Sequence, residues 1–166
     1  MTEQTVNEII LLWTENFQTV EHGYYYSKDL DNFKIQATPT RDSYIEPFDC
    51  RGAKVDETVP GWFENNVFEI SASGATEGLS SEMRLSLFHQ RILRVRFYIS
   101  QSAVVQFFDR EHDRFLGEIE TAGGVVDYTV PDITTQKIGR VSIYHDIRFG
   151  GPAIDTVQGY GWHRDT

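Results

Sequence analysis

Arginine and tyrosine side chains alternate with apolar ones in the segment 92–100, ILRVRFYIS. Successive side chains of a β-strand point to opposite faces, so Arg94, Arg96 and Tyr98 are expected to share one face. Arginine offers five donors in a planar fork that suits carboxylates, phosphates or sugar hydroxyls, and tyrosine offers an apolar plate with a polar tip. The pattern predicts a binding face for a glycan or small polar ligand. A solvated face, with each arginine paired to a carboxylate across the strands, is the alternative.

Neighbouring predicted strands would extend this face if they pair with that segment. The expected ligand-binding residues are Arg94, Arg96, Tyr98, Gln106, Arg140 and Tyr144, with Phe108 and Ser142 beside them. The aromatic runs GYYYS and GYGW have two interpretations of the same kind, because such clusters line sugar sites and also build ordinary β cores.

Acidic residues in the polar loops suggest a calcium site. Asp29 and Asp31, in KDLDN, have the spacing that opens an EF-hand loop. The third acidic ligand, the central glycine and the distal glutamate are missing, which excludes an EF-hand. Two interpretations remain: calcium ligands, together with acidic residues of the segment EPFDC, or turn aspartates bonded to backbone amides.

Common catalytic motifs are missing from the sequence: it has no HExxH, no Gly-x-Ser-x-Gly and no P-loop. His112, in DREHDR, and His145, before Asp146, have a carboxylate nearby and can be general bases or ordinary surface residues. Cys50 precedes Arg51, which would lower the pKa of a reactive thiol, but a small buried residue is the alternative.

The net charge of −10 opposes binding to nucleic-acid phosphates and to anionic membranes. Cys50 is the single cysteine, so no internal disulfide can form. The acidic start MTEQTVNEIILLWTENF lacks the basic region and cleavage site of a signal peptide, and no apolar run reaches the roughly 18 residues of a membrane span. A cytoplasmic location is expected, or a secreted one if a leader has been removed.

The chain has 166 residues, of which 40 % are apolar and 13 % aromatic. Roughly eight or nine short strands without alternating helices predict one β-rich domain over 1–166. The expected fold is mainly β, a two-sheet antiparallel sandwich of jelly-roll type, and a small closed barrel is the alternative.

The N-terminal segment fits a helix or an extra strand. Thr5 and Glu8 form a capping box, which favours a helix, and segment 9–13 also fits a buried strand. The apolar positions with helical spacing are Val6, Ile9, Ile10, Trp13 and Phe17. Further along, the sequence predicts turns at 28–32 and 39–42, a hairpin over 103–121 and a bulge at Gly139.

Three patterns follow one another in the C-terminal half: a hairpin over 109–117, Ile-x-x-Val-x-Ile over 138–143, and Ile-Asp-x-Val over 154–157. This order resembles the C-terminal half of galactose-binding-like and related carbohydrate-module jelly rolls. The resemblance covers about 84–160 and implies a jelly-roll fold and ligand binding. In several such families the aspartate of the closing strand helps to hold a structural calcium ion, which would make Asp155 a metal ligand with Asp29 and Asp31.

These observations favour a non-catalytic module that binds a glycan or small polar ligand on a sheet face or rim loops. A small calcium-dependent or acid/base isomerase, cyclase or lyase with an internal pocket is the first alternative. A homo-oligomeric interaction protein, for example a homodimer that pairs edge strands, is the second.

Overall fold

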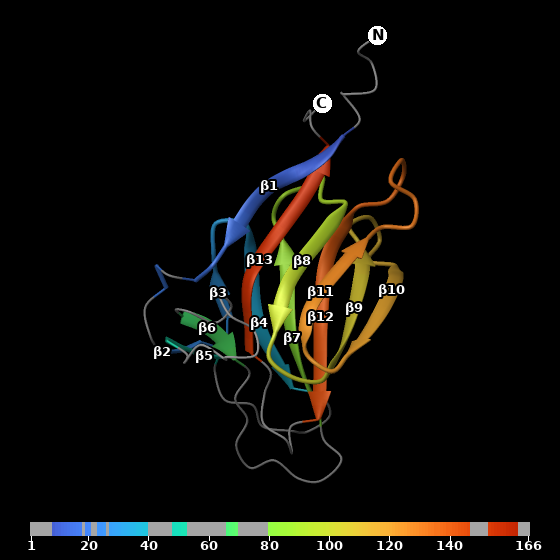
Figure 1. Cartoon of the computed structure of the whole chain (residues 1–166). Helices are drawn as coiled ribbons and strands as arrows, with labels where there is room; N and C mark the ends of the chain where they lie inside the picture. The colour runs from blue at the N-terminus through green and yellow to red at the C-terminus, as the bar shows by residue number, and fades with distance from the viewer. Residues whose placement is uncertain are drawn as a thin grey trace.

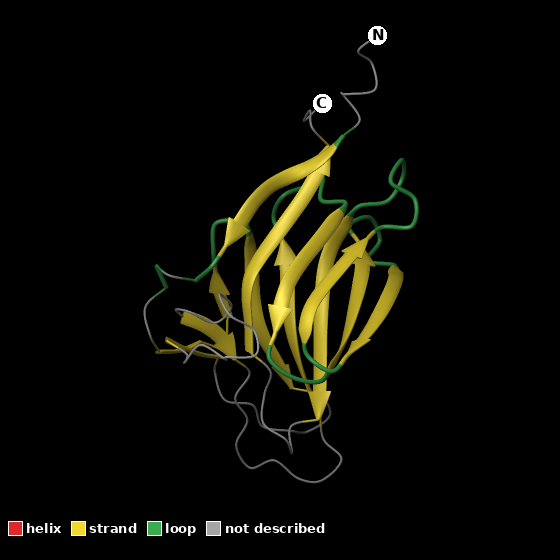
Figure 2. Ribbon diagram, in the orientation of Figure 1, coloured by secondary structure: helices red, strands yellow, loops and turns green. Residues whose placement is uncertain are grey.

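The computed structural model describes residues 8–17, 19–20, 23–25, 27–39, 48–52, 66–69, 80–146 and 153–162. In these ranges the chain forms strands and loops and no helix (Figure 2). No helix long and apolar enough to cross a membrane therefore occurs in this part of the chain.

The strands form two antiparallel sheets (Figure 1). The seven-stranded sheet has the order β11 (Gly124–Thr129), β8 (Arg94–Ile99), β13 (Ala153–Trp162), β6 (Asn66–Glu69), β5 (Phe48–Gly52), β2 (Gly23–Tyr25), and β1 (Ile9–Glu15) also pairs with β13. The six-stranded sheet has the order β10 (Phe115–Thr121), β9 (Ala103–Asp109), β12 (Ile138–Asp146), β7 (Ser80–Leu87), β4 (Phe33–Pro39), β3 (Ser27–Asp29).

Alternating burial makes these sheets pack face to face. In β8 every second side chain is buried, and Val95 and Phe97 are completely inaccessible to solvent. Burial of such side chains is the main favourable term in folding. The core includes Phe33, Ile35, Met83, Leu85, Val95, Phe97, Val105, Phe107, Val141, Ile143, Ile154 and Val157, drawn from both sheets.

From β7 onward the chain changes sheet at every connection except the β9–β10 hairpin. Each sheet also ends on its own edge strands, β11 and β2 in one and β10 and β3 in the other. The fold is therefore a two-sheet antiparallel sandwich of jelly-roll type, as predicted, and the closed-barrel alternative is wrong.

The helical interpretation of the N-terminal segment is wrong, and the strand alternative is confirmed. β1 pairs with the C-terminal half of β13, with Trp13 opposite Gly159. A side chain at Gly159 would come within 2.4 Å of the Trp13 indole, so the glycine leaves the space in which the indole packs. Burial of Trp13 against β13 outweighs the local helical pattern, because most of the stability of an amphipathic element comes from tertiary packing.

Several local predictions are confirmed. A turn at 30–32 joins β3 and β4, the β9–β10 hairpin forms, and the register of β12 against β9 shifts between Ile138 and Arg140, as a bulge at Gly139 requires. The described ranges hold thirteen strands rather than eight or nine, because the edges carry several three- to five-residue strands with little sequence signal. The predicted turn at 39–42 extends beyond the described residues.

The open edge between β10 and β11 is filled by an aromatic pair. Tyr128 of β11 stacks on Phe107 of β9, with ring centroids 4.2 Å apart and planes inclined by 5°. The Oη atom of Tyr128 is buried and has no hydrogen-bond partner in the described part of the chain. Desolvation raises the pKa of this phenol. Tyr128 therefore acts here as an apolar plate that joins the two sheets.

Candidate functional site

The structure divides the predicted binding face between two sheets. Arg94, Arg96 and Tyr98 lie on β8 in the seven-stranded sheet, whereas Gln106 lies on β9 in the six-stranded sheet. Arg140 and Tyr144 lie on β12, beside Gln106. The expected pairing of these strands with β8 is wrong, because the chain crosses to the other sheet directly after β8. Alternation determines which side chains point outward, but it does not determine which strands become neighbours.

The first candidate surface is the Arg–Tyr face, which we define as Arg94, Arg96, Tyr98, Gln158 and Tyr160. β13 pairs with β8, so that Gln158 lies opposite Arg96 and Tyr160 opposite Arg94. The guanidinium carbon of Arg94 lies 4.5 Å from the centre of the Tyr160 ring, and that of Arg96 lies 5.5 Å from the centre of the Tyr98 ring. Both distances permit cation–π attraction, which orients the rings and the guanidinium groups together.

Gln158 links the members of this face. Its Oε1 accepts hydrogen bonds from Arg96 Nη1 at 3.1 Å and from the Tyr160 hydroxyl at 3.3 Å. Its Nε2 donates a long hydrogen bond of 3.5 Å to Thr14 Oγ1 on β1. Residues of three adjacent strands are therefore held in one polar network.

Arg94 is paired to a carboxylate of the edge strand β11. Its Nε and Nη2 donate to Asp127 Oδ1 and Oδ2 at 2.8 and 2.6 Å, in a bidentate arrangement. These hydrogen bonds lower the pKa of the Asp127 carboxyl, against a smaller opposing effect of desolvation. The cross-strand pairing that sequence reasoning gave as the alternative therefore exists for Arg94, whereas Arg96 donates to the uncharged Gln158.

A bulge in β13 produces this arrangement. Asp155 lies opposite Tyr98 and Gln158 opposite Arg96, so β13 advances three residues while β8 advances two. Thr156 carries the extra residue with a φ of +53°, a left-handed conformation that is rare for a β-branched residue. The Thr156 amide donates to Asp155 Oδ1 at 2.7 Å. The bulge brings Gln158 and Tyr160, rather than Val157 and Gly159, opposite the arginines.

The second candidate surface is the outer face of the six-stranded sheet, with Arg140 at its centre. Arg140 forms a bidentate pair with Asp113, 3.0 Å for each contact, and donates to Ser142 Oγ at 2.9 Å. Its guanidinium carbon lies 3.7 Å from the centre of the Phe108 ring. Gln106 is separately engaged, because its amide donates to Glu118 Oε1 at 2.8 Å. This face is largely occupied by contacts among its own side chains.

Glu82 is a buried carboxylate on the same outer face. Its side chain is only 4 % exposed, and it accepts hydrogen bonds from Arg84 Nε and Nη2 at 3.0 and 3.1 Å. Arg140 Nη1 lies 3.5 Å from its Oε2. The hydrogen bonds with Glu82 raise the pKa of Arg84. Buried charges persist only when they are paired and hydrogen-bonded in this way.

The predicted calcium ligands do not come together. Asp29 and Asp31 are exposed at the β3–β4 turn of one sheet, and Asp155 is 4 % exposed on β13 of the other. Within the described ranges no three His, Cys, Asp or Glu residues are grouped as a metal site would need. Glu46 and the side chain of Asp49 lie outside the described part, so calcium binding by Asp29 or Asp31 with other oxygens stays a prediction.

Sequence reasoning missed a carboxylate near this turn. Glu15, Lys28, Asp29 and Asp31 line a cavity of about 190 Å³. Glu15 Oε2 accepts a hydrogen bond of 2.9 Å from the amide of Phe17, which has a φ of +62°. Burial raises the pKa of Glu15, and the negative charge of Asp31 adds to that rise against the opposing effect of the Phe17 amide.

The other predicted chemical groups contribute little to a site. His112 is exposed at the tip of the β9–β10 hairpin, where its Nε2 lies 3.9 Å from Glu111 Oε1. The side chains of Cys50 and His145 are outside the described part of the structure. The sequence did not indicate Gln158 and Asp127 as site residues, because their roles depend on the register between strands. Tyr160 had a signal in the sequence, since it lies in the aromatic run GYGW.

No family model matches the sequence, and no curated protein matches it. The chain is similar in structure to a mannan-recognising carbohydrate-binding module, TmCBM27, with a TM-score of 0.47, 11% identity, and coverage of 93% of this chain and 98% of that one. It is also similar to a family 29 carbohydrate-binding module from Piromyces equi, with a TM-score of 0.40, 12% identity, and coverage of 80% and 95%. A third similar structure is the enzymatically active domain of tailspike protein 4 of bacteriophage CBA120, with a TM-score of 0.45 and 14% identity. The match covers 80% of this chain but only 20% of the tailspike chain.

Proposed function

We propose that the protein is a non-catalytic binding module and that its Arg–Tyr face binds a neutral glycan. The observation that carries the proposal is the network in which Gln158 joins Arg96 and Tyr160 across two paired strands. It holds two tyrosine rings and several polar groups in fixed positions on an outer face. A face ordered before binding loses little conformational entropy when the ligand arrives.

The charges of this face favour an uncharged ligand. The Arg94 guanidinium is neutralised by Asp127 through two short hydrogen bonds. Arg96 retains its positive charge, but the carboxylate of Asp127 is close enough for Arg96 to lower the Asp127 pKa. Sugar hydroxyls can donate to Gln158 Oε1 and accept from the remaining N–H groups of the arginines. The half-buried rings of Tyr98 and Tyr160 offer apolar surface for a sugar ring.

Affinity electrophoresis in gels that contain a neutral mannan, galactan or glucan tests the proposal. Retardation of the wild type by at least one of these polysaccharides is expected, and Arg96→Ala or Tyr98→Ala should weaken binding about tenfold, the effect of losing roughly 1.4 kcal/mol. Tyr144→Ala is the matched control, because Tyr144 lies on β12 in the other sheet. Equal retardation of Arg96→Ala, Tyr98→Ala and wild type would exclude this face.

The enzyme alternative requires an internal pocket with an acid and a base. Between the described strands the space is instead filled by apolar side chains that are completely buried, such as Phe97 and Phe107. This packing favours a binding module whose ligand stays outside the sandwich. The homo-oligomer alternative stays a prediction, which the elution volume on gel filtration at several concentrations would test.

A further inference from the structure

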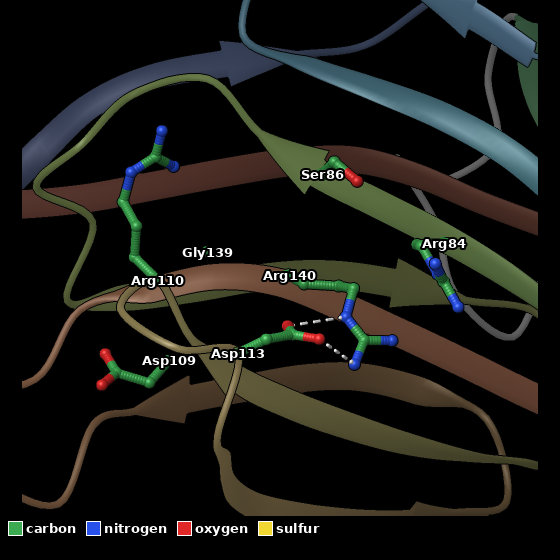
Figure 3. A pocket seen from close by; sticks show the side chains of 7 residues that line it. All are labelled: Arg84, Ser86, Asp109, Arg110, Asp113, Gly139 and Arg140. Carbon is green, nitrogen blue, oxygen red and sulfur yellow. Dashed lines mark hydrogen bonds and ion pairs between the residues drawn. The ribbon is translucent and has the colours of Figure 1, made fainter.

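Two cavities that share lining residues lie at the end of the six-stranded sheet, where the β9–β10 loop meets the start of β12. Figure 3 shows the first of them, which is lined by residues such as Arg84 and Gly139. The first has a volume of about 330 Å³ and the second about 230 Å³. Asp109 and Arg110 line both of them. The volume of the first is near the lower end of the range for small-ligand sites, and the volume of the second is just below that range. The Arg–Tyr face is on the other sheet and shares no residue with them.

Arginines 84, 110 and 140 line the first cavity, but two of them are neutralised. Arg84 pairs with the buried Glu82, and Arg140 pairs with Asp113. Arg110 differs, because the side-chain hydrogen bond that it makes within the described ranges goes from Nη1 to the carbonyl oxygen of Leu87 at 2.7 Å. Among the described residues no carboxylate lies within ion-pair distance of Arg110. In the part of the chain that the structure describes, four of its five N–H donors make no hydrogen bond and can bind a ligand.

The backbone of Arg110 is held in place from two sides. Its amide donates to the carbonyl oxygen of Lys137 at 2.8 Å, and the Lys137 amide donates to Asp109 Oδ1 at 3.1 Å. Gly139 lies against it so closely that a Cβ there would come within 2.6 Å of the Arg110 Cα. In Figure 3 the Arg110 side chain extends away from Asp109 and Asp113. The backbone of Arg110 is therefore fixed, and the hydrogen bond to Leu87 anchors one nitrogen of its guanidinium.

The rest of the lining suits hydroxyl groups. Ser86 lines the first cavity, and Gln90, Thr135 and Lys137 line the second. Asp109 offers a second carboxylate oxygen as an acceptor. A ligand that satisfies both Arg110 and Asp109 needs an oxyanion and several hydroxyl donors. The net charge of −10 opposes densely charged polyanions, so a single charge on each unit is favoured.

We propose that these two cavities form an acidic-sugar site, in which Arg110 binds the carboxylate of a hexuronate through its planar guanidinium. Lys137 adds a second positive charge, and Asp109, Gln90 and Thr135 bind the sugar hydroxyls. A guanidinium and a carboxylate can form two parallel N–H···O hydrogen bonds, and a neutral sugar cannot form this pair. The site is independent of the proposed neutral-glycan face.

Titration calorimetry with galacturonate and glucuronate, with galactose, glucose and inorganic sulfate as comparison ligands, tests the proposal. Binding of at least one hexuronate is expected, at least about tenfold tighter than its neutral counterpart. Arg110→Gln should weaken that binding by about tenfold or more, and Arg110→Lys should give an intermediate affinity. Arg114→Gln is the matched control, because Arg114 is exposed on the same loop and lines neither cavity. It makes the same change of net charge and should leave the affinity unchanged.

The proposal would be overturned if neither hexuronate bound the wild type, or if Arg110→Gln and Arg114→Gln bound the hexuronate with equal affinity. If sulfate binds as tightly as both hexuronates, the site is a simple oxyanion site and not a sugar site. The variant Arg96→Ala separates the two proposals, because it should weaken the binding of neutral polysaccharide about tenfold and leave hexuronate binding intact. Melting temperatures of all variants establish that each is folded.

Discussion

Gln158 lies opposite Arg96 because Thr156 adds one residue to β13 between the two stretches in which it pairs with β8. The oxygen of the Gln158 side chain then accepts a hydrogen bond of 3.1 Å from the guanidinium. Bulges of this kind re-aim side chains and recur beside functional sites. The cost of this bulge falls on Thr156, whose left-handed backbone crowds its branched side chain.

Thr156→Gly should raise the free energy of unfolding by about 1 kcal/mol, because glycine adopts a positive φ without steric cost. The measurement is urea denaturation at equilibrium. Thr129→Gly, in the regular strand β11, is the control and should lower the free energy of unfolding. A loss of the same size at both positions would show that Thr156 is not strained.

Asp127→Asn should lower the melting temperature at neutral pH by removing the charge that Arg94 binds. Arg94 lowers the folded-state pKa of Asp127, so the pair stabilises the protein fully above the unfolded-state pKa of about 3.9. That contribution is lost as the pH falls through the lower folded-state value. Both side chains are more than a third exposed, which limits the effect to at most about 1 kcal/mol. Melting curves of the two proteins should differ at pH 7 and converge in acid, and a constant difference would contradict this assignment.

Glu15→Gln should have the opposite pH dependence. Burial raises the folded-state pKa of Glu15, so the folded protein holds this proton more tightly than the unfolded chain does. The wild type therefore loses stability as the pH rises from the unfolded-state pKa through the higher folded-state value. Glutamine does not ionise, so it avoids that loss, and its side-chain oxygen can still accept a hydrogen bond from the Phe17 amide. Its melting temperature relative to wild type should rise between acid and neutral pH, and a flat difference would be the contrary result.

Tyr128→Phe should leave stability unchanged or raise it, because the buried hydroxyl has no partner whose hydrogen bond would be lost. The ring remains stacked on Phe107. Tyr160→Phe is the comparison, since it removes the hydrogen bond to Gln158. In equilibrium denaturation Tyr128→Phe should have a larger free energy of unfolding than Tyr160→Phe. The reverse order would mean that the Tyr128 hydroxyl is hydrogen-bonded in solution.

Calcium binding near the β3–β4 turn is tested by melting in EDTA and in millimolar calcium. Calcium that binds only the folded protein stabilises it by RT ln(1 + [Ca²⁺]/Kd), which raises the melting temperature. If Asp29 and Asp31 are ligands, the rise should disappear in Asp31→Asn and persist in Asp127→Asn, whose carboxylate lies on the other sheet. Identical melting of the wild type in both buffers would exclude calcium at that concentration.

The alternation of residues 93–99 was enough to predict which β8 side chains are buried, because a strand beside an apolar core has only one workable orientation. The jelly-roll sandwich followed from the number and spacing of such segments. The partners of β8 could not be predicted in the same way. They depend on a sheet crossing at residues 100–102, where the sequence Ser-Gln-Ser permits either a hairpin or a crossing.

The bulge was also beyond prediction from the sequence. A threonine inside Ile-Asp-Thr-Val is typical of a regular strand, and local preference disfavours the conformation that Thr156 adopts. Segment 9–13 shows the same limitation, because its apolar residues fit a helix as well as a strand. The deciding factor was a distant one, the space beside Gly159 that accepts Trp13.

The division of the arginines between two sheets has a further consequence for engineering. The Arg–Tyr face and the acidic-sugar site lie on opposite layers, which in stacked sheets are about 10 Å apart before side chains are counted. Substitutions that far apart, with no common partner, change free energy additively. Each surface can therefore be redesigned or mutated while the other serves as an internal reference for folding in the same molecule.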